Sequence, residues 1–72
     1  MHVVRVIVAS PAEAADGNAE LWCGGELMAI TELYEGRLHL RIDPRTDGEP
    51  WRVDTTSLAL ALNDAARQLA TY

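Results

Sequence analysis

Lysine and phenylalanine are absent from this sequence, which has one cysteine and two histidines. The single cysteine, Cys23, excludes an internal disulfide framework, and with two histidines it provides no clear cluster of metal ligands. The sequence also has no Gly-rich phosphate loop, no Cys-x-x-Cys pair and no His-Glu-x-x-His helix. We therefore expect a protein that is not an enzyme and that holds neither a cofactor nor a metal ion.

Long apolar runs are missing as well. The longest one, residues 58–62, is far shorter than the roughly 20 residues that a membrane-spanning helix needs. No basic start followed by an apolar stretch is visible, so the sequence shows no secretory signal. We expect a cytoplasmic protein that does not enter a membrane.

Basic residues are few: six arginines stand against eleven aspartates and glutamates, which gives a net charge of −5. This balance argues against a nonspecific nucleic-acid binder, because the neutralisation of phosphates normally supplies that affinity. The 72 residues allow one domain, residues 1–72, of which 49% are apolar. A chain this short buries only about 60% of its unfolded surface, so a core shared between two copies is one route to stability.

The apolar pattern predicts three to four strands. Residues 3–9 are dense in β-branched side chains, which are enriched in strands. Gly24-Gly25 and Glu35-Gly36 fit two-residue hairpin turns, and the segments around them predict strands at about 19–23, 26–34 and 37–43. Residues 10–18 read as a loop in which one short helical turn can form.

One helix is expected at the C-terminal end. Residues 54–57 offer several N-cap side chains, and the apolar residues that follow recur at helical spacing, which predicts a helix over about 56–70. The predicted fold is α+β: a small antiparallel β-meander with this helix packed on one face. The pattern leaves open whether the first strand pairs at either sheet edge or with a second copy.

Two-residue turns fix the register of the hairpins, and directly opposed residues share one face of the sheet. Leu21 is then opposed to Met28, and Ala29 is opposed to both Glu20 and Ile42. The expected core face consists of Trp22, Leu27, Ala29, Thr31, Leu33, Leu38, Leu40 and Ile42. The expected outer face mixes Leu21, Cys23, Met28, Ile30 and Tyr34 with Glu26, Glu32, Arg37, His39 and Arg41.

Apolar side chains inside a charged rim are typical of protein–protein contacts. The sequence therefore predicts a non-enzymatic protein-interaction module, either a homodimer or an inhibitor- or antitoxin-type partner protein. Substituting Ile30 by Asp should then release the partner without unfolding the protein. The predicted partner-binding residues are Leu21, Met28, Ile30, Tyr34, Arg37, His39 and Arg41.

Two alternatives remain at this point. Arg37, His39 and Arg41 point the same way with Tyr34 nearby, and such a strip can bind RNA or single-stranded nucleic acid. Cys23 and His39 are the one possible nucleophile–base pair, but they lie on nonadjacent strands and nothing supplies an oxyanion pocket. We expect Cys23 to pack as a small apolar residue.

The order strand–hairpin–hairpin–helix, ending in Leu-Ala-Leu-Asn-Asp-Ala-Ala-Arg-Gln-Leu over residues 60–69, resembles the HicB-type antitoxin domain. The resemblance implies a small sheet packed on an Ala-rich helix that follows a Thr/Ser cap. The proline-rich strand end of that family is missing here, and no further strand follows the helix. In size and acidity the chain is also similar to small inhibitor proteins such as anti-CRISPR and immunity proteins.

Overall fold

The structure, a computed structural model, describes residues 3–72, so Met1 and His2 of the predicted domain lie outside the described residues. It confirms the α+β class and the meander, because its four strands form one antiparallel sheet in the order β1-β2-β3-β4. The elements are β1 (Val4–Ile7), α1 (Pro11–Ala15), β2 (Glu20–Cys23), β3 (Glu26–Tyr34), β4 (Arg37–Ile42) and α2 (Thr55–Thr71).

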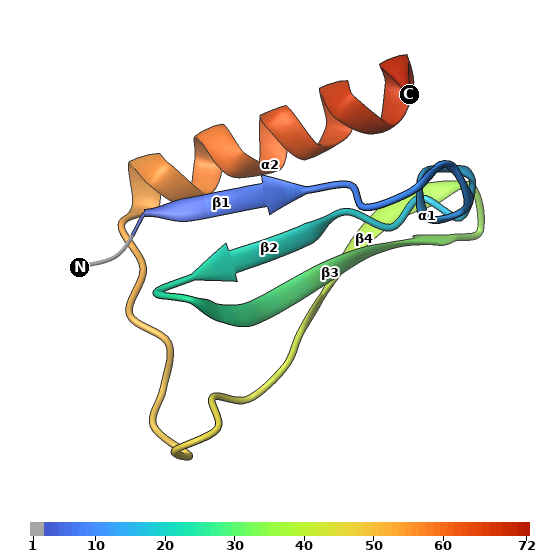
Figure 1. The fold of residues 1–72 in the computed structure, drawn as a ribbon. Coiled ribbons are helices and arrows are strands. Elements are labelled where there is room, and N and C mark those ends of the chain that lie inside the picture. The colour runs from blue at the N-terminus through green and yellow to red at the C-terminus, as the bar shows by residue number, and fades with distance from the viewer. Residues whose placement is uncertain (1–2) are drawn as a thin grey trace.

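Strand β1 lies at one edge of the sheet and pairs with β2, with Val4 opposite Cys23 and Ile7 opposite Glu20. The backbone N–H of Val4 donates a hydrogen bond of 2.9 Å to Ser57 Oγ in the first turn of α2. Figure 1 shows α2 running alongside β1. One side chain of the helix therefore occupies the edge of the sheet that β1 would otherwise expose.

Helix α2 begins at an aspartate cap, as the run of cap residues indicated. Asp54 Oδ2 accepts a hydrogen bond of 2.8 Å from the backbone N–H of Ser57 and so satisfies one of the free donors of the first turn. Ala61 and Ala65 are the buried residues of the helix. Because both side chains are small, α2 approaches the sheet closely.

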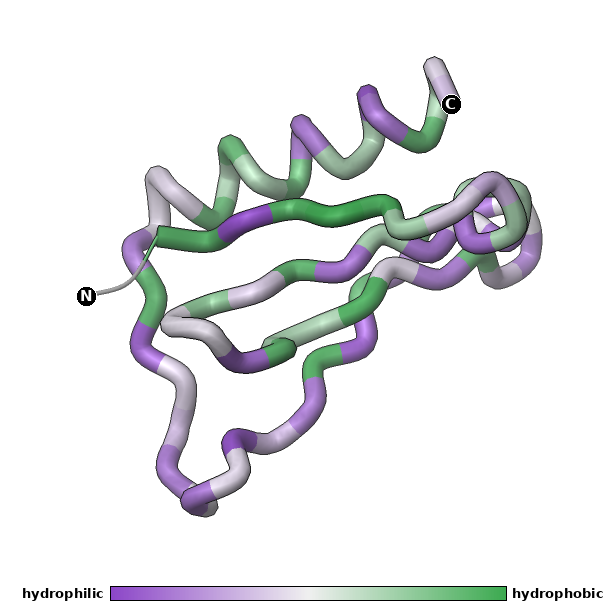
Figure 2. The backbone as a smooth tube through the Cα atoms, viewed as in Figure 1, coloured by the Kyte–Doolittle hydropathy of each residue, from purple (hydrophilic) through white to green (hydrophobic). Residues whose placement is uncertain are grey.

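The core lies between α2, β1 and the middle of the sheet. Figure 2 shows that β1 is hydrophobic apart from one hydrophilic segment at Arg5, whereas the loop between β4 and α2 is mostly hydrophilic. Trp51 in that loop is fixed by its Nε1–H, which donates a 2.7 Å hydrogen bond to the Asp43 carbonyl. The buried core residues are Val4, Leu21, Cys23, Met28, Ala29 and Ala61, with Val6, Leu40, Trp51, Val53 and Leu58 packed against them.

A β-bulge between β2 and β3 corrects the predicted register. Trp22 pairs with Leu27 as expected, but Leu21 then pairs with Ala29 rather than with Met28. Met28 is the extra residue on β3, so Met28 and Ala29 are both buried although they are neighbours in the chain. The bulge brings both of them to the core.

The bulge also exchanges the faces of β2. Leu21 and Cys23, which were expected on the outer face, are buried in the core. Trp22 and Leu27, which were expected in the core, are only half-buried. Cys23 therefore does pack as a small apolar core residue, but on the face of the sheet opposite to the predicted one.

The register between β3 and β4 is the predicted one, from Tyr34 opposite Arg37 to Ala29 opposite Ile42. The core expectation is nevertheless wrong at the end of this hairpin. Leu33, Leu38 and Ile42 are 53%, 41% and 59% exposed. Helix α2 makes its closest packing against β1, at the other edge of the sheet, so it does not cover these side chains.

The loop after β1 contains the short helix α1, at the place where the sequence predicted a loop with one possible helical turn. Ser10 Oγ accepts a 3.2 Å hydrogen bond from the Glu13 N–H, and Glu13 Oε2 accepts one of 3.1 Å from the Ala9 N–H. Gly17 then ends the helix at φ +73°, with its Cα against the Leu33 side chain. A Cβ at Gly17 would lie within 3 Å of Leu33, so α1 seats closely on the β3–β4 hairpin.

Candidate functional site

The outer face, which is the face of the sheet opposite to α2, carries a central group of large apolar side chains. Trp22 and Leu27 are direct neighbours across β2 and β3, and Ile30 lies further along β3. All three are half-buried, and Ile7 on β1 is 42% exposed. Tyr34 lies on the same face at the hairpin end, with Glu32 between it and Ile30. We call these residues the outer cluster: Ile7, Trp22, Leu27, Ile30 and Tyr34.

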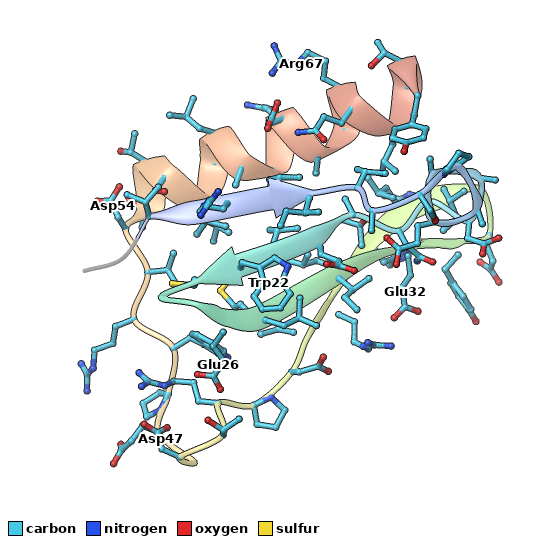
Figure 3. The ribbon with its side chains drawn as sticks, in the orientation of Figure 1. Trp22, Glu26, Glu32, Asp47, Asp54 and Arg67 are labelled. Carbon is cyan, nitrogen blue, oxygen red and sulfur yellow. The ribbon has the colours of Figure 1, made fainter. Side chains whose placement is uncertain are left out.

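The indole of Trp22 has a fixed position. Its Nε1–H donates a 3.0 Å hydrogen bond to Glu20 Oε1 two residues earlier on the same strand. Figure 3 shows Trp22 in front of β2 and β3, with α2 beyond β1. A hollow of about 250 Å³ lies beside it, lined by Arg5, Ile7 and the Gly24-Gly25 turn. The ring is therefore held at the surface with free space on one side.

Tyr34 and His39 lie at the free end of the β3–β4 hairpin. Their rings meet edge to face, with centroids 5.5 Å apart and planes at 89°. Tyr34 is 64% exposed and stands opposite the exposed Arg37. These three side chains share the outer face, as the predicted register required.

Arg41, the third member of the predicted basic strip, is held by carboxylates. Its Nη1 lies 3.0 Å from Glu32 Oε1, and its Nε lies 3.3 Å from Asp43 Oδ1. Two negatively charged carboxylates thus flank one positively charged guanidinium. Arg41 contributes little net positive potential to the strip with Arg37 and His39.

An acidic groove of about 410 Å³ adjoins the outer cluster beside α1. Four carboxylate side chains and one guanidinium line it, and Ile30 forms part of its wall. Figure 3 shows Glu32 on this side of the sheet. A hollow lined mainly by charges of one sign concentrates the electrostatic field. The charged residues of the groove are Glu13, Asp16, Glu20, Glu32 and Arg41.

The structure brings Ile30, Tyr34, Arg37, His39 and Arg41 of the predicted site together on the outer face. It removes the other two predicted residues from that face. Their places are taken by Trp22 and Leu27, which the expected register had put in the core. The two displaced residues, Leu21 and Met28, are buried in the core, 0% and 3% exposed.

The sequence explains why this exchange was not predicted. Residues 27–30 form an unbroken apolar run in β3, Leu-Met-Ala-Ile, so alternation does not say which of them face the core. Ile7 was missed for another reason, because no turn of fixed length joins β1 to β2. The sequence missed these outer-face residues because the strand register was unknown, and not because of their residue types.

The described residues hold little that points to catalysis or metal binding. Cys23 is buried on the helix side of the sheet and His39 is exposed on the outer face, so the two cannot act as a nucleophile–base pair. Within residues 3–72, no group of three or more His, Cys, Asp or Glu side chains is arranged to hold a metal ion.

Helix α2 carries one perturbed carboxyl group. Hydrogen bonds from Arg67 and Gln68 hold the pKa of Asp64 below its usual range. Asp64 and Arg67 line a hollow between α2 and β1. Neither helix of residues 3–72 combines the length and the apolar character that crossing a bilayer requires.

Comparison with known proteins gives this chain no relatives: no protein family, no characterised protein and no solved structure matches it. The site must therefore be interpreted from its own residues. Its features are an ordered aromatic and aliphatic centre, a hairpin end with Tyr34 and Arg37, and an acidic groove.

Proposed function

We propose that this protein is a non-enzymatic protein-interaction module that binds a basic surface of another protein through its outer face. The observation that carries the proposal is the outer cluster, a row of large apolar side chains on a sheet face without a helix above it. A solvated face of an antiparallel sheet is normally polar. Here large apolar side chains stand among charged ones, with Glu20 and Glu32 between them.

The outer cluster has the composition of a binding centre. Tryptophan, tyrosine and arginine are the residues that most often carry the binding energy of protein interfaces. Trp22 is already ordered by its bond to Glu20, so little side-chain entropy is lost when a partner covers it. Tyr34 adds a large exposed ring at the hairpin end.

The charge around the cluster defines the partner. Glu13, Asp16, Glu20 and Glu32 line the groove beside it, and the whole chain carries a net charge of −5. A partner that places arginine or lysine in this groove gains complementary contacts, and the long-range field speeds its association. This fits an inhibitor-type protein that covers the basic surface of its target.

Binding of RNA or single-stranded nucleic acid is the second candidate, and Tyr34, His39 and Arg37 at the hairpin end favour it. Stacking platforms beside a cation are the usual means of such binding. Phosphates, however, would meet the acidic groove, and Arg41 is held by Glu32 and Asp43. The electrostatics therefore support a protein partner better.

A photo-cross-linking amino acid at position 34 tests the proposal in cells that express the protein. Position 60 on α2 is the matched control, because Leu60 and Tyr34 are both 64% exposed and Leu60 is remote from the outer face. We expect one basic protein to be captured from position 34 and not from position 60. Binding of that purified protein should then be lost in Ile30→Asp and weakened in Tyr34→Ser.

Circular dichroism must show that both variants are folded, and Tyr34→Ser keeps the test decisive if Ile30→Asp unfolds. Equal capture from positions 34 and 60 would contradict the proposal. Titration with a single-stranded RNA oligonucleotide at several salt concentrations separates the second candidate. Affinity that falls steeply with salt and is lost in Arg41→Ala would favour nucleic acid instead.

A further inference from the structure

We propose that the free edge of β4 pairs with the β4 of a second copy of this chain, antiparallel and centred on Leu40. The two sheets then form one continuous sheet with both α2 helices on the same side. This surface is separate from the apolar centre of the outer face, and it does not depend on the function proposed above. It rests on the hydrogen-bonding edge, the exposed side chains and the charges of β4.

The two edges of the sheet differ in how they are covered. At β1 the N–H of Val4 is bonded to Ser57 of α2, whereas β4 is the last strand in the order at the other edge. The N–H of Asp43 donates a 3.0 Å hydrogen bond back to the Met28 carbonyl on β3. Because backbone groups alternate along a strand, those of Ile42 and of the residues two and four before it point away from the sheet.

The same alternate residues carry the apolar side chains of β4, which we call the β4 strip: Leu38, Leu40 and Ile42. Leu38 and Ile42 are 41% and 59% exposed on the helix side, while Leu40 between them is half-buried against the core. An open strand edge with exposed apolar side chains is a template for another strand, and natural proteins usually block such edges. Here the exposed backbone groups and the exposed apolar side chains belong to one set of residues.

Charge favours the register centred on Leu40 over those centred on residues 39 and 41, although that register also places His39 opposite Arg41. With Leu40 opposite Leu40 of the second copy, Leu38 faces Ile42 and Arg37 faces Asp43, and the symmetry repeats both contacts. Like charges directly opposed across strands are unfavourable, and unlike charges are favourable. Centring on His39 would oppose Arg37 to Arg41, and centring on Arg41 would oppose the two copies of that arginine.

The position of α2 permits this arrangement. The helix packs against β1, at the edge of the sheet opposite to β4, so it leaves the helix side of β4 free for a neighbour. Directly opposed residues of an antiparallel pair share a face, so the two β4 strips meet on the helix side. The outer faces of the two copies then lie side by side, and both stay accessible to a partner protein.

Sedimentation equilibrium on a charge-exchange series tests the register. The proteins are the wild type, Arg37→Glu, Asp43→Arg and the double variant with both changes. We expect a wild-type dimer whose dissociation constant rises about tenfold or more in each single variant, because each places like charges opposite one another at two symmetric positions. The double variant restores the unlike pair and should return the dissociation constant close to the wild-type value.

Ile42→Pro, with Ile42→Ser as its control, tests the backbone pairing. Proline removes the outward N–H of β4 without breaking a hydrogen bond inside the sheet, and edge strands tolerate it. We expect Ile42→Pro to abolish the dimer and Ile42→Ser, which keeps the N–H, to weaken it less. Neither change touches the outer face, so cross-linking from position 34 reports on the proposed function independently.

A wild-type protein that sediments as a monomer at millimolar concentration overturns the proposal, and so do single charge variants that dimerise like the wild type. If the dimer survives Ile42→Pro, or if Leu60→Ser on α2 dissociates it, the contact lies on another surface. Either result also overturns the proposal. Hα–Hα contacts between His39 and Arg41 of different copies, in a mixture of labelled and unlabelled protein, would establish the register directly.

Discussion

The half of the sheet next to α2 and the half that ends at β4 contain similar apolar residues, but these residues have different environments. Val4 and Leu21 are 7% and 0% exposed, whereas Leu38 and Ile42 are 41% and 59% exposed. A helix is about 10 Å across and neighbouring strands are about 4.8 Å apart. One helix therefore cannot cover all four strands: β3 still contributes the buried Met28, Ala29 and Thr31, but β4 and the end of β3 beyond Thr31, which we call the open half, stay mostly exposed.

The comparison indicates a division of tasks. The covered half supplies the burial that stabilises so short a chain, and we propose that the open half keeps an apolar edge for another molecule. The division predicts that equal substitutions in the two halves have unequal effects on the free energy of unfolding and on amide exchange.

The largest difference is expected between Leu21→Ala and Leu38→Ala. Leu21 is fully buried, so its truncation leaves a cavity and should lower the free energy of unfolding by about 3 kcal/mol. Leu38 is partly solvated, and at a concentration where the protein is monomeric its truncation should cost less than about 1 kcal/mol. Urea unfolding measures both, and equal losses would mean that the open half also belongs to the folding core.

Thr31→Val tests the polar link between α1 and β3. The buried Thr31 hydroxyl donates to the Gly17 carbonyl and accepts from the Ala19 N–H, both at 2.7 Å. Valine has a similar shape but leaves both backbone groups without that partner, so we expect a loss of about 1–3 kcal/mol. Thr31→Ser, which retains the hydroxyl, is the control. A neutral Thr31→Val would show that water replaces the hydroxyl.

Ser57→Ala should have the smallest effect of the three, about 1 kcal/mol. It removes the acceptor for the Val4 N–H and so uncovers the β1 edge. Hydrogen exchange of the Val4 amide should become faster, while the amides of β4 should not change. Thr56→Ala, at an exposed neighbouring position, serves as the control. An unchanged Val4 amide would contradict the assignment of Ser57 as the cover of that edge.

The β3–β4 hairpin could be predicted from the sequence because its turn is local. Glu35 and Gly36 take φ values of 53° and 76°, as a two-residue hairpin turn requires, and the turn fixes the register. Helix α2 could be predicted for a similar reason, because its apolar spacing and its aspartate cap are adjacent in the chain. Of the five apolar side chains expected on the outer face, only Ile30 and Tyr34 lie there, because the other three are buried in the core.

The bulge at Met28 could not be predicted, because residues 27–30 are all apolar and either face would accept them. That one insertion moved Trp22 to the outer face and Leu21 to the core. The place of β1 depends on contacts with Ser57, which is distant in sequence. The interpretation of residues 10–18 as a loop with one possible helical turn did not use the Ser-x-x-Glu spacing of Ser10 and Glu13, which is a local signal for the start of α1.

Amide hydrogen exchange at micromolar and at millimolar protein concentration tests most directly whether the two halves have separate tasks. The amides of β2 and of α2 should be protected equally at both concentrations, because the covered half is stabilised within one chain. The amides of Leu38, Leu40 and Ile42 should be unprotected in the dilute sample and protected in the concentrated one. Exchange of these three amides that does not depend on concentration would contradict the proposed role of the open half.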